Sequence, residues 1–295
     1  MTWLGVDMGG TASRWVLADR GGVITRGQAP GATALRADAT QRGGFDAALA
    51  EIRAALPAAP RAAALGLTGA GHAPGRALAA TCAGPLGLAP DRVRVMNDVQ
   101  LAWHAAFPAG GPGHLVLAGT GSVGLGRAGG DWVEVGGRGA LIDDAGSAVW
   151  ITLRALDLIY RRIDEQGRPE GCELLADALF TALGARDWDG VCARVHAMPR
   201  GDLGALAVAV AGAARAGDRA AAGVLARAAE ELIRLARALA ARCGPAPLVL
   251  AGGLLAPGGG IRDALAERLA GQTARFATLD AAAAGARLAM KGDRP

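Results

Sequence analysis

The chain has 295 residues, of which 52% are hydrophobic and only 4% aromatic, so its core must be built largely from Ala, Leu and Val. The formal net charge is +4, but the arginines are scattered and no basic run interleaves with aromatic residues, which argues against nucleic-acid binding. Lys291 is the only lysine, which excludes a P-loop, protein-kinase chemistry and Schiff-base chemistry.

The cysteines and the termini of the sequence predict a cytoplasmic protein. Cys82, Cys172, Cys192 and Cys243 stand at no metal-ligand spacing, so we expect reduced, mostly apolar thiols. The N-terminus lacks the pattern of a signal peptide. No stretch approaches the roughly 20 uncharged residues that a membrane-spanning helix needs.

The first third of the chain predicts three strands, with the first hairpin starting at 3–6, and then alternating helices and strands. Pro57 ends the first expected helix. The later elements are expected at 43–56 (helix), 62–68 (strand), 75–83 (helix), 92–96 (strand) and 99–107 (helix). The Pro- and Gly-rich segment 108–113 is the best linker candidate, and we place the main domain boundary there.

After that boundary, the chain predicts a second hairpin unit from His114 and a mostly helical region over 147–242. The clearest helix begins near Asp218, a good N-cap, and ends at Gly244 before Pro245. Its buried stripe is predicted to consist of Leu225, Leu232, Leu235 and Leu239. The remaining elements are expected at 247–251 (strand), 260–270 (helix), 274–277 (strand) and 281–290 (helix), a mixed α/β architecture.

One short pattern, a strand followed by a Gly/Thr loop and a second strand, occurs twice and is typical of a phosphate clamp. The first loop contains Asp7, Gly9, Gly10 and Thr11. Its glycines allow backbone N–H groups to converge on an anion, which would place Gly9, Gly10 and Thr11 against phosphate oxygens. Asp7 could hold a hydrated Mg²⁺, because this ion keeps waters and takes few carboxylates. The alternative is a tight turn with an Asx cap.

The second loop runs through Gly119, Thr120, Gly121 and Ser122 and continues to Gly124. It also matches the G-x-G-x-x-G pattern of dinucleotide sites, which require a helix directly after the glycines. Here the following residues predict a hairpin, so we favour a phosphate loop.

Three further segments carry candidate chemistry. Asn97-Asp98, between a strand and a helix, is either a helix N-cap or supplies a general base that accepts a proton from a substrate hydroxyl. The Gly-rich loop 136–150 is either a substrate loop whose carboxylate binds sugar hydroxyls or a flexible connection with Asp144 or Ser147 as N-cap. Gly252-Gly253, after an apolar strand, would let adenine and ribose lie close to the backbone.

The order of these motifs resembles the sugar kinases of the actin-like ATPase superfamily over nearly the whole chain. The likeness is strongest to the N-acetylglucosamine and glucosamine kinase branch, in the family shared with the ATPase activators of benzoyl-CoA reductase and 2-hydroxyacyl-CoA dehydratase. The loop 136–150 is similar to the family pattern G-G-W-G-x-x-x-G-D-E-G-S-x-x-W. The matching positions are Gly136, Gly137, Gly139, Asp144, Gly146, Ser147 and Trp150.

The resemblance implies a role for each motif. Asp98 would be the catalytic carboxylate, and the two glycine loops with Gly252-Gly253 would bind ATP. Asp7 would hold Mg²⁺ through water. The implied sugar-binding residues are Thr33, Asn97, Asp98, Gly137, Arg138 and Asp144. Gly285-Ala286 lies where the second connecting helix of the family passes between the lobes.

Several positions depart from the family pattern, and they affect the expected substrate. Arg138 replaces the Trp, Asp143 the Gly and Ala145 the Glu, while Thr33 stands near an expected Asn. An arginine beside the sugar pocket could pair with a carboxylate or a phosphate, so an acidic sugar is a second candidate.

The resemblance implies a two-lobed, ribonuclease-H-like α/β fold with its active site in the cleft between the lobes. We expect one lobe at 1–112, with the final helix at about 281–295 packing back on it, and a second lobe with a helical insertion at 113–280. The implied reaction is transfer of the ATP γ-phosphoryl group to the carbon-six hydroxyl of N-acetylglucosamine or glucosamine. Relatives are often dimers, so the resemblance also implies a homodimer.

Three other functions stay open. An activator ATPase would need closely placed thiolates for an iron–sulfur cluster, and the four cysteines have no obvious partners. A sugar-responsive repressor would need a DNA-binding helix pair ahead of the kinase-like part. A non-catalytic nucleotide-binding protein is the third, because Ala145 replaces an expected acid.

Overall fold

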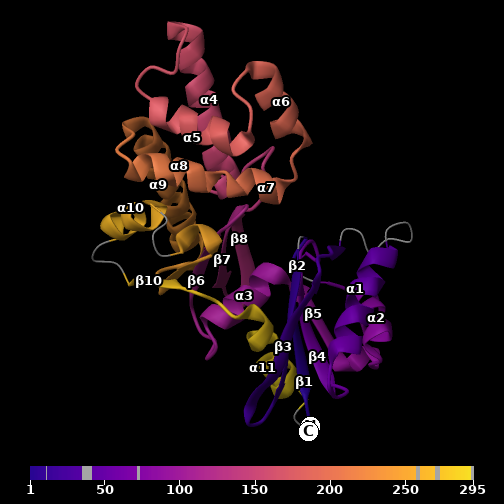
Figure 1. Cartoon of the computed structure of the whole chain (residues 1–295). Helices are drawn as coiled ribbons and strands as arrows, with labels where there is room; N and C mark the ends of the chain where they lie inside the picture. Colours follow the sequence, from indigo (N-terminus) through magenta and orange to yellow (C-terminus); the bar gives the residue numbers. More distant parts are fainter. Residues whose placement is uncertain (11, 35–41, 72–73, 257–259, 270–272, 294–295) are drawn as a thin grey trace. The chain divides into compact units, whose positions relative to one another are not determined.

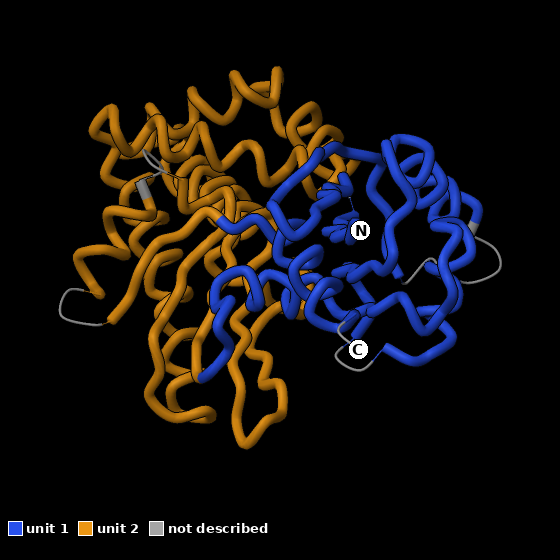
Figure 2. The backbone as a smooth tube through the Cα atoms, turned by 90° about the horizontal axis from the view of Figure 1, so that it is seen from below, with its two compact units in different colours: residues 1–111, 279–295 blue, residues 112–278 orange. Residues whose placement is uncertain are grey.

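The computed structural model describes all residues except 11, 35–41, 72–73, 257–259, 270–272 and 294–295 (Figure 1). The chain divides into two compact units (Figure 2). Unit 1 contains Met1–Gly111 and Leu279–Pro295, and unit 2 contains Pro112–Thr278. The final segment of the chain therefore belongs to the same unit as the N-terminus.

Unit 1 is built on a five-stranded sheet with the order β3-β2-β1-β4-β5. Strand β1 (Trp3–Met8) runs parallel to β4 (Ala62–Leu67), and β4 runs parallel to β5 (Val93–Asn97). Strands β2 (Ala12–Asp19) and β3 (Gly22–Pro30) complete an antiparallel meander with β1. The carboxyl ends of β1, β4 and β5 consequently lie at one edge of the sheet.

The two faces of this sheet have different covers because side chains alternate along each strand. Helices α1 (Arg42–Ala55) and α2 (Arg76–Leu86) cover one face, where Leu4, Val6 and Met8 are buried with residues of both helices (Figure 1). Helices α3 (Asp98–Ala106) and α11 (Ala281–Gly292) lie against the other face.

Helix α11 lies unusually close to the sheet, because glycine meets glycine there. A Cβ atom at Gly285 would lie 2.9 Å from the Cα of Gly5, and one at Gly5 would overlap the backbone of α11. The end of the helix is fixed by Asp293, whose carboxylate accepts bonds from Trp3, Arg61 and Arg92. Gly285, predicted from family resemblance to lie in a connecting helix, packs against the first strand at Gly5.

Unit 2 repeats the topology of unit 1, with the strand order β10-β9-β6-β7-β8. Strands β6 (His114–Ala118), β9 (Leu248–Ala251) and β10 (Ala274–Ala277) are parallel. Strands β7 (Ser122–Ala128) and β8 (Asp131–Gly136) form the antiparallel part. The duplicated strand–loop–strand pattern of the sequence therefore corresponds to a duplicated sheet.

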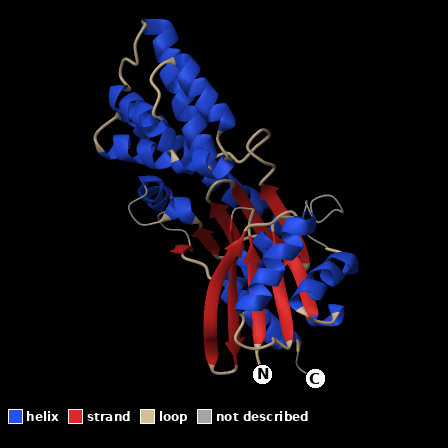
Figure 3. Cartoon of the chain, turned by 45° about the vertical axis from the view of Figure 1, so that its right-hand side comes forward, coloured by secondary structure: helices blue, strands red, loops and turns tan. Residues whose placement is uncertain are grey.

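Helices form most of the remainder of unit 2 (Figure 3). Helix α9 (Arg219–Cys243) packs on the sheet and on α10 (Gly260–Arg268), α8 (Ala207–Arg215) and α4 (Ala148–Gln166). Its predicted leucine stripe is buried, and the side chain of Asp218 caps its first turn. The other helices are α5 (Glu173–Leu183), α6 (Trp188–Ala197) and α7 (Arg200–Ala205).

One helix is longer than predicted. Helix α2 continues through Gly84-Pro85 to Leu86 and ends where Gly87 adopts a left-handed conformation with a φ of 67°. A proline so close to the end of a helix removes a single backbone hydrogen bond, which the buried Leu86 offsets.

Two single 3-10 turns, at Pro90–Arg92 and Gly253–Leu255, precede or follow strands. No helix in the described part of the chain is both long and apolar enough to cross a membrane.

Candidate functional site

The candidate catalytic carboxylate, Asp98, lies at the carboxyl edge of the unit 1 sheet, where β5 gives way to α3. Thr68, the residue after β4, donates its hydroxyl hydrogen to Oδ2 of Asp98 at 2.6 Å. The backbone of Thr68 is itself fixed, because its N–H donates to the carbonyl of Met8 at 3.1 Å. Asp98 is thus held by the ends of two neighbouring strands, while part of its side chain stays accessible.

Asn97, a predicted sugar-binding residue, acts as the N-cap of α3. Its side-chain oxygen accepts a hydrogen bond from the N–H of Val99 at 2.8 Å, and its own N–H donates to Oε1 of Gln100 at 3.0 Å. This reciprocal pair is a capping box. The cap fixes the first turn of α3 and so fixes the backbone of Asp98, the first residue of that helix.

The first glycine loop lies beside Thr68 and joins β1 to β2. The N–H of Gly9 donates to the carbonyl of Ala12 at 3.1 Å, and the carbonyl of Gly9 accepts from Ala32 at 3.0 Å. Ala34 then donates to the carbonyl of Thr68 at 2.9 Å, so the segment carrying Thr33 crosses this edge of the sheet. The position of a Cβ at Gly10 has open space around it, and Thr11 lies outside the described residues.

Asp7 carries the largest electrostatic anomaly of this edge. Its carboxyl pKa is raised to about 6, first by burial and then by the negative charge of Asp98. Asp280 raises it further and Arg14 opposes the shift. Two carboxylates that repel one another at a strand end are a fit for a divalent cation, which would offset both charges. Among the described residues, no group of three His, Cys, Asp or Glu forms a complete metal site, so such an ion would keep most of its waters.

The second glycine loop joins β6 to β7 in unit 2. The N–H of Gly119 donates to the carbonyl of Gly121 at 2.9 Å, which closes the loop. Ser122 is the first residue of β7, and its hydroxyl donates to the carbonyl of Ala145 at 2.8 Å. The dinucleotide alternative is wrong for this loop, because an antiparallel strand and not a helix follows the glycines.

The predicted substrate loop lies directly against this second glycine loop. Asp144 is 3% exposed and has a φ of 59°, the only positive φ at a non-glycine residue among those described. A Cβ at Gly121 would lie 2.9 Å from Oδ2 of Asp144. The same oxygen accepts a hydrogen bond from Nη2 of Arg200 at 2.5 Å. A buried and paired carboxylate in a left-handed backbone conformation, beside a glycine loop, is the kind of geometry found at functional sites.

The rest of the substrate loop is more open. Arg138 has a 60% exposed side chain that pairs with Asp143 at 3.4 Å, and Arg234 of α9 lies 3.7 Å from the same carboxylate. Gly137 has a φ of 71°, which a side chain rarely adopts. The family departures at 138 and 143 therefore form an ion pair with one another.

Gly252 and Gly253 follow β9, but only the first is in close contact. Gly252 has a φ of 118°, and a Cβ there would overlap the carbonyl oxygen of Ala118 at the end of β6. A Cβ at Gly253 would meet nothing within 4 Å. Gly252 thus lets two strand ends approach, whereas Gly253 leaves the space that a ligand could use.

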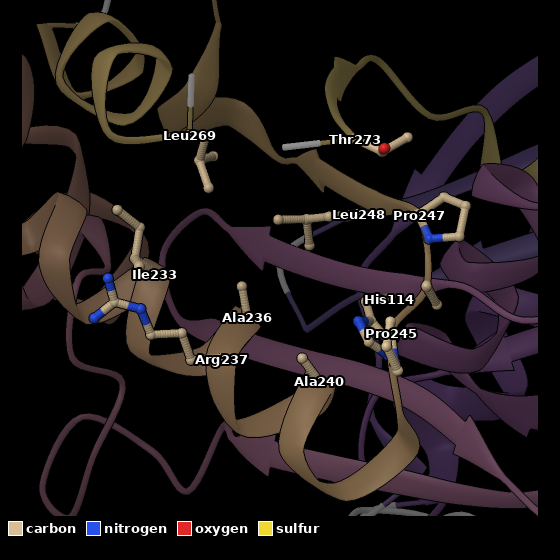
Figure 4. Close-up of a pocket in the computed structure, with 11 residues that line it drawn as sticks. His114, Ile233, Ala236, Arg237, Ala240, Pro245, Pro247, Leu248, Leu269 and Thr273 are labelled. Carbon is tan, nitrogen blue, oxygen red and sulfur yellow. The ribbon is translucent and has the colours of Figure 1, made fainter. Parts of the chain in front are cut away.

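A cavity of about 490 Å³ lies elsewhere in unit 2 (Figure 4). It is lined by His114, Arg237 and Leu248, among other residues. His114 starts β6 and Leu248 starts β9, so the cavity is at the amino ends of these strands, whereas the Gly119–Ser122 loop and Gly252-Gly253 are at their carboxyl ends. It is therefore separate from the candidate site.

Sequence reasoning missed Thr68 and Arg200. Each contacts a predicted carboxylate from a distant part of the chain, 30 residues from Asp98 and 56 from Asp144. Thr68 had one usable signal, its place between a buried strand and a glycine-rich turn. Arg200 had none, because it lies in a helical region with many arginines.

Solved structures resemble the chain over almost its whole length. A protein of Chromobacterium violaceum, provisionally named an N-acetylglucosamine kinase, is 28% identical, with a TM-score of 0.76 and 98% of both chains covered. A Porphyromonas gingivalis protein with the same provisional name is 19% identical, with a TM-score of 0.72, covering 98% of this chain and 99% of the other. A ROK family glucokinase from Streptomyces griseus, solved with glucose and AMPPNP, shares the fold at 18% identity and a TM-score of 0.59, covering 99% and 100%.

Curated proteins offer no match to this sequence. A family model does match, over residues 4–289, and so includes both sheets and the final helix. This confirms the family and the actin-like ATPase fold that the motifs predicted. The chain belongs to the BadF/BadG/BcrA/BcrD ATPase family.

Proposed function

We propose that the protein transfers the γ-phosphoryl group of ATP to a hydroxyl of an amino sugar. The hydroxyl would be that on carbon six of N-acetylglucosamine or glucosamine. The proposal is supported by the provisional name of the Chromobacterium violaceum protein, which is 28% identical over 98% of this chain. The family match supports the ATPase part of the proposal.

The observation that carries the proposal is the placement of Asp98. Its carboxylate is held by Thr68 at 2.6 Å and stands at the edge where the Gly9–Gly10 loop and the Thr33 segment also lie. A carboxylate fixed beside a phosphate loop can orient a sugar hydroxyl and take its proton as the hydroxyl attacks. Such a base accelerates the reaction by about 10² to 10⁴.

The other residues would position the substrates. The glycine loops at Gly9–Gly10 and Gly119–Ser122 would bind phosphates through backbone N–H groups, and Gly253 would leave room for the adenosine. Asp7 would hold Mg²⁺ through water, and the bound ion would offset negative charge on the phosphates. Thr33, Asn97, Gly137, Arg138 and Asp144 are the proposed sugar-side residues.

The placement of two cysteines disfavours the activator ATPase alternative. Cys82 and Cys172 are buried inside units 1 and 2, so neither presents a thiolate at a surface that a second subunit could share for a cluster. An acidic sugar remains a second candidate because of Arg138. Its guanidinium is exposed and sits in the substrate loop, where it could exchange Asp143 for a substrate carboxylate.

A coupled ADP-release screen tests the proposal directly. Amino sugars, neutral hexoses and sugar acids are compared at equal concentration, with Mg²⁺ present and absent. We expect Mg²⁺-dependent turnover that is fastest with N-acetylglucosamine or glucosamine, and loss of that turnover in Asp98→Asn. Turnover with sugar acids alone would favour the second candidate, and no sugar-dependent ADP release would contradict both.

A further inference from the structure

Arg200 occupies a position in unit 2 that the proposed function has not used. It begins α7 and donates from Nη2 to Oδ2 of Asp144 at 2.5 Å. The two partners differ in exposure, since the Asp144 side chain is 4% exposed and that of Arg200 is 54% exposed. One end of the pair is therefore buried in the substrate loop, whereas the other reaches solvent.

The guanidinium lies over the second glycine loop. A Cβ placed on Gly121 would be 3.4 Å from Nη2 of Arg200. Helix α7 contacts the same loop at a second point, where a Cβ on Gly204 would be 3.6 Å from Cγ2 of Thr120. The backbone of α7 at Gly204 therefore lies close to Thr120, in the same loop that the guanidinium of Arg200 reaches.

The chemistry of this arrangement suits a phosphate. A guanidinium has five N–H donors in a planar fork that matches phosphate oxygens. Among the described residues, Asp144 is the only hydrogen-bond acceptor of Arg200, so donors remain. The only lysine, Lys291, belongs to unit 1, so unit 2 can supply a guanidinium but no ammonium group to this loop.

We infer that Arg200 binds a phosphate group of the nucleotide at the Gly119–Ser122 loop, and that Asp144 competes with that phosphate for the same guanidinium. The inference rests on the proposed function in one respect, that the loop binds a nucleotide. It adds a phosphate-binding residue and a coupling between the substrate loop and nucleotide affinity. When the phosphate draws the guanidinium away, an oxygen of Asp144 becomes available to a sugar hydroxyl.

A purely structural role for Arg200 predicts something different. A buried carboxylate needs a partner, and Arg200 could do no more than neutralise Asp144. In that case, substitution of either residue would change stability and sugar binding but would leave nucleotide affinity unchanged. Under our inference, the two substitutions move nucleotide affinity in opposite directions.

Isothermal titration of the full chain with ATP and with AMP, without sugar, separates these roles. AMP is the internal control, because it retains the adenosine but lacks the outer phosphates. We expect Arg200→Gln to weaken ATP binding about tenfold or more, as for loss of a charge-assisted hydrogen bond, and to leave AMP binding unchanged. We expect Asp144→Asn to tighten ATP binding severalfold, because the competing charge is gone.

Arg234→Gln is the matched control, since Arg234 pairs with the neighbouring Asp143 and has no contact with the glycine loop among the described residues. It should bind ATP as the wild type does. Arg200→Gln alone leaves the buried Asp144 carboxylate without its partner and could unfold for that reason. The double variant Arg200→Gln/Asp144→Asn removes both charges and so avoids this problem. It should bind ATP as weakly as Arg200→Gln.

Unchanged ATP affinity in Arg200→Gln or in the double variant would overturn the inference. Weaker ATP binding in Asp144→Asn would overturn the competition. If the wild type binds no ATP at all, the proposed function fails together with the inference. If ATP binds with the expected pattern but no sugar is phosphorylated, the inference stands and the sugar proposal fails.

Discussion

The two carboxylates that the sequence predicted to be functional, Asp98 in unit 1 and Asp144 in unit 2, have opposite electrostatic surroundings. Asp98 accepts a hydrogen bond from a neutral donor, the hydroxyl of Thr68. It also lies close enough to a second carboxylate, Asp7, for its negative charge to raise the pKa of Asp7. Asp144 is nearly fully buried and is held by a cation, Arg200. The sheets beneath them have the same topology, so the difference lies in the residues added at the strand ends.

This difference indicates that the two sheet edges suit ligands of different charge. At the unit 1 edge two carboxylates, Asp7 and Asp98, repel one another and Arg14 offsets this only in part, which favours a cation there. At the unit 2 edge the carboxylate of Asp144 is already neutralised by the half-exposed Arg200. A repeated fold can therefore carry two distinct kinds of site on equivalent edges.

The largest expected effect is on turnover. Asp98→Asn should lower kcat by about 10² to 10⁴, because the amide cannot accept a proton from the sugar hydroxyl. ATP affinity, measured by titration without sugar, should stay close to the wild-type value. Near-normal turnover would remove Asp98 from the mechanism and leave its bond to Thr68 a structural one.

The next effect is on sugar affinity. Asp144→Asn should raise the sugar KM about ten- to a hundredfold, since a carboxylate makes stronger hydrogen bonds with hydroxyls than an amide does. The value of kcat at saturating sugar should fall much less. An unchanged sugar KM would show that the 136–150 loop is not the substrate loop.

Asp7 provides a test by pH. Its folded-state pKa of about 6 exceeds the ordinary value of 3.8, so the folded protein holds this proton more tightly than the unfolded chain does. The contribution of Asp7 should therefore lower the free energy of unfolding as the pH rises from about 4 to 6. Above pH 6 this contribution should stay constant. Asp7→Asn should remove the fall and be more stable than the wild type at pH 7.5 by up to about 3 kcal/mol.

Chemical denaturation at pH 4 and pH 7.5 measures this difference for both proteins. Mg²⁺ should stabilise the wild type at pH 7.5 but not Asp7→Asn, because the ion needs the ionised carboxylate. Equal Mg²⁺ responses of the two proteins would place the ion elsewhere.

The smallest expected effect concerns Thr68. Thr68→Val removes the hydroxyl that fixes Asp98 but keeps the shape, so kcat should fall about tenfold with little change in stability. Thr68→Ser, which retains the hydroxyl, should recover most of the activity. Equal loss in both variants would mean that packing and not the hydrogen bond matters.

The fold was largely predictable because its signals are local. Apolar strands ending in glycine loops predicted both hairpins, and Asp218 with Gly244 bounded α9 correctly. The same locality explains why the helix expected at 75–83 ends later, since it continues through Pro85 to the buried Leu86. For Asn97-Asp98 the N-cap interpretation is confirmed at Asn97, whereas the role of Asp98 as a general base stays a prediction.

The site was less predictable, because its interactions join distant parts of the chain. The bond from Thr68 to Asp98 and the pair of Arg200 with Asp144 exist only after the strands and α7 are assembled. The raised pKa of Asp7 likewise depends on burial and on the charge of Asp98. The spacing of residues in the sequence does not predict such long-range contacts, whereas hydrophobic periodicity does predict the helices and strands.

Helix α11 has a consequence for how the chain is synthesised. Val16, Ala18, Ala62 and Ala64 of the first sheet are buried beneath a helix that the ribosome makes after the other described helices and strands of both units. A nascent N-terminal unit therefore emerges with part of one sheet face uncovered, and this part stays in contact with water until residue 293 can reach Arg61 and Arg92. Folding of the first unit is thus complete only after the second unit has been translated, which couples the quality of the N-terminal half to intact translation through α11.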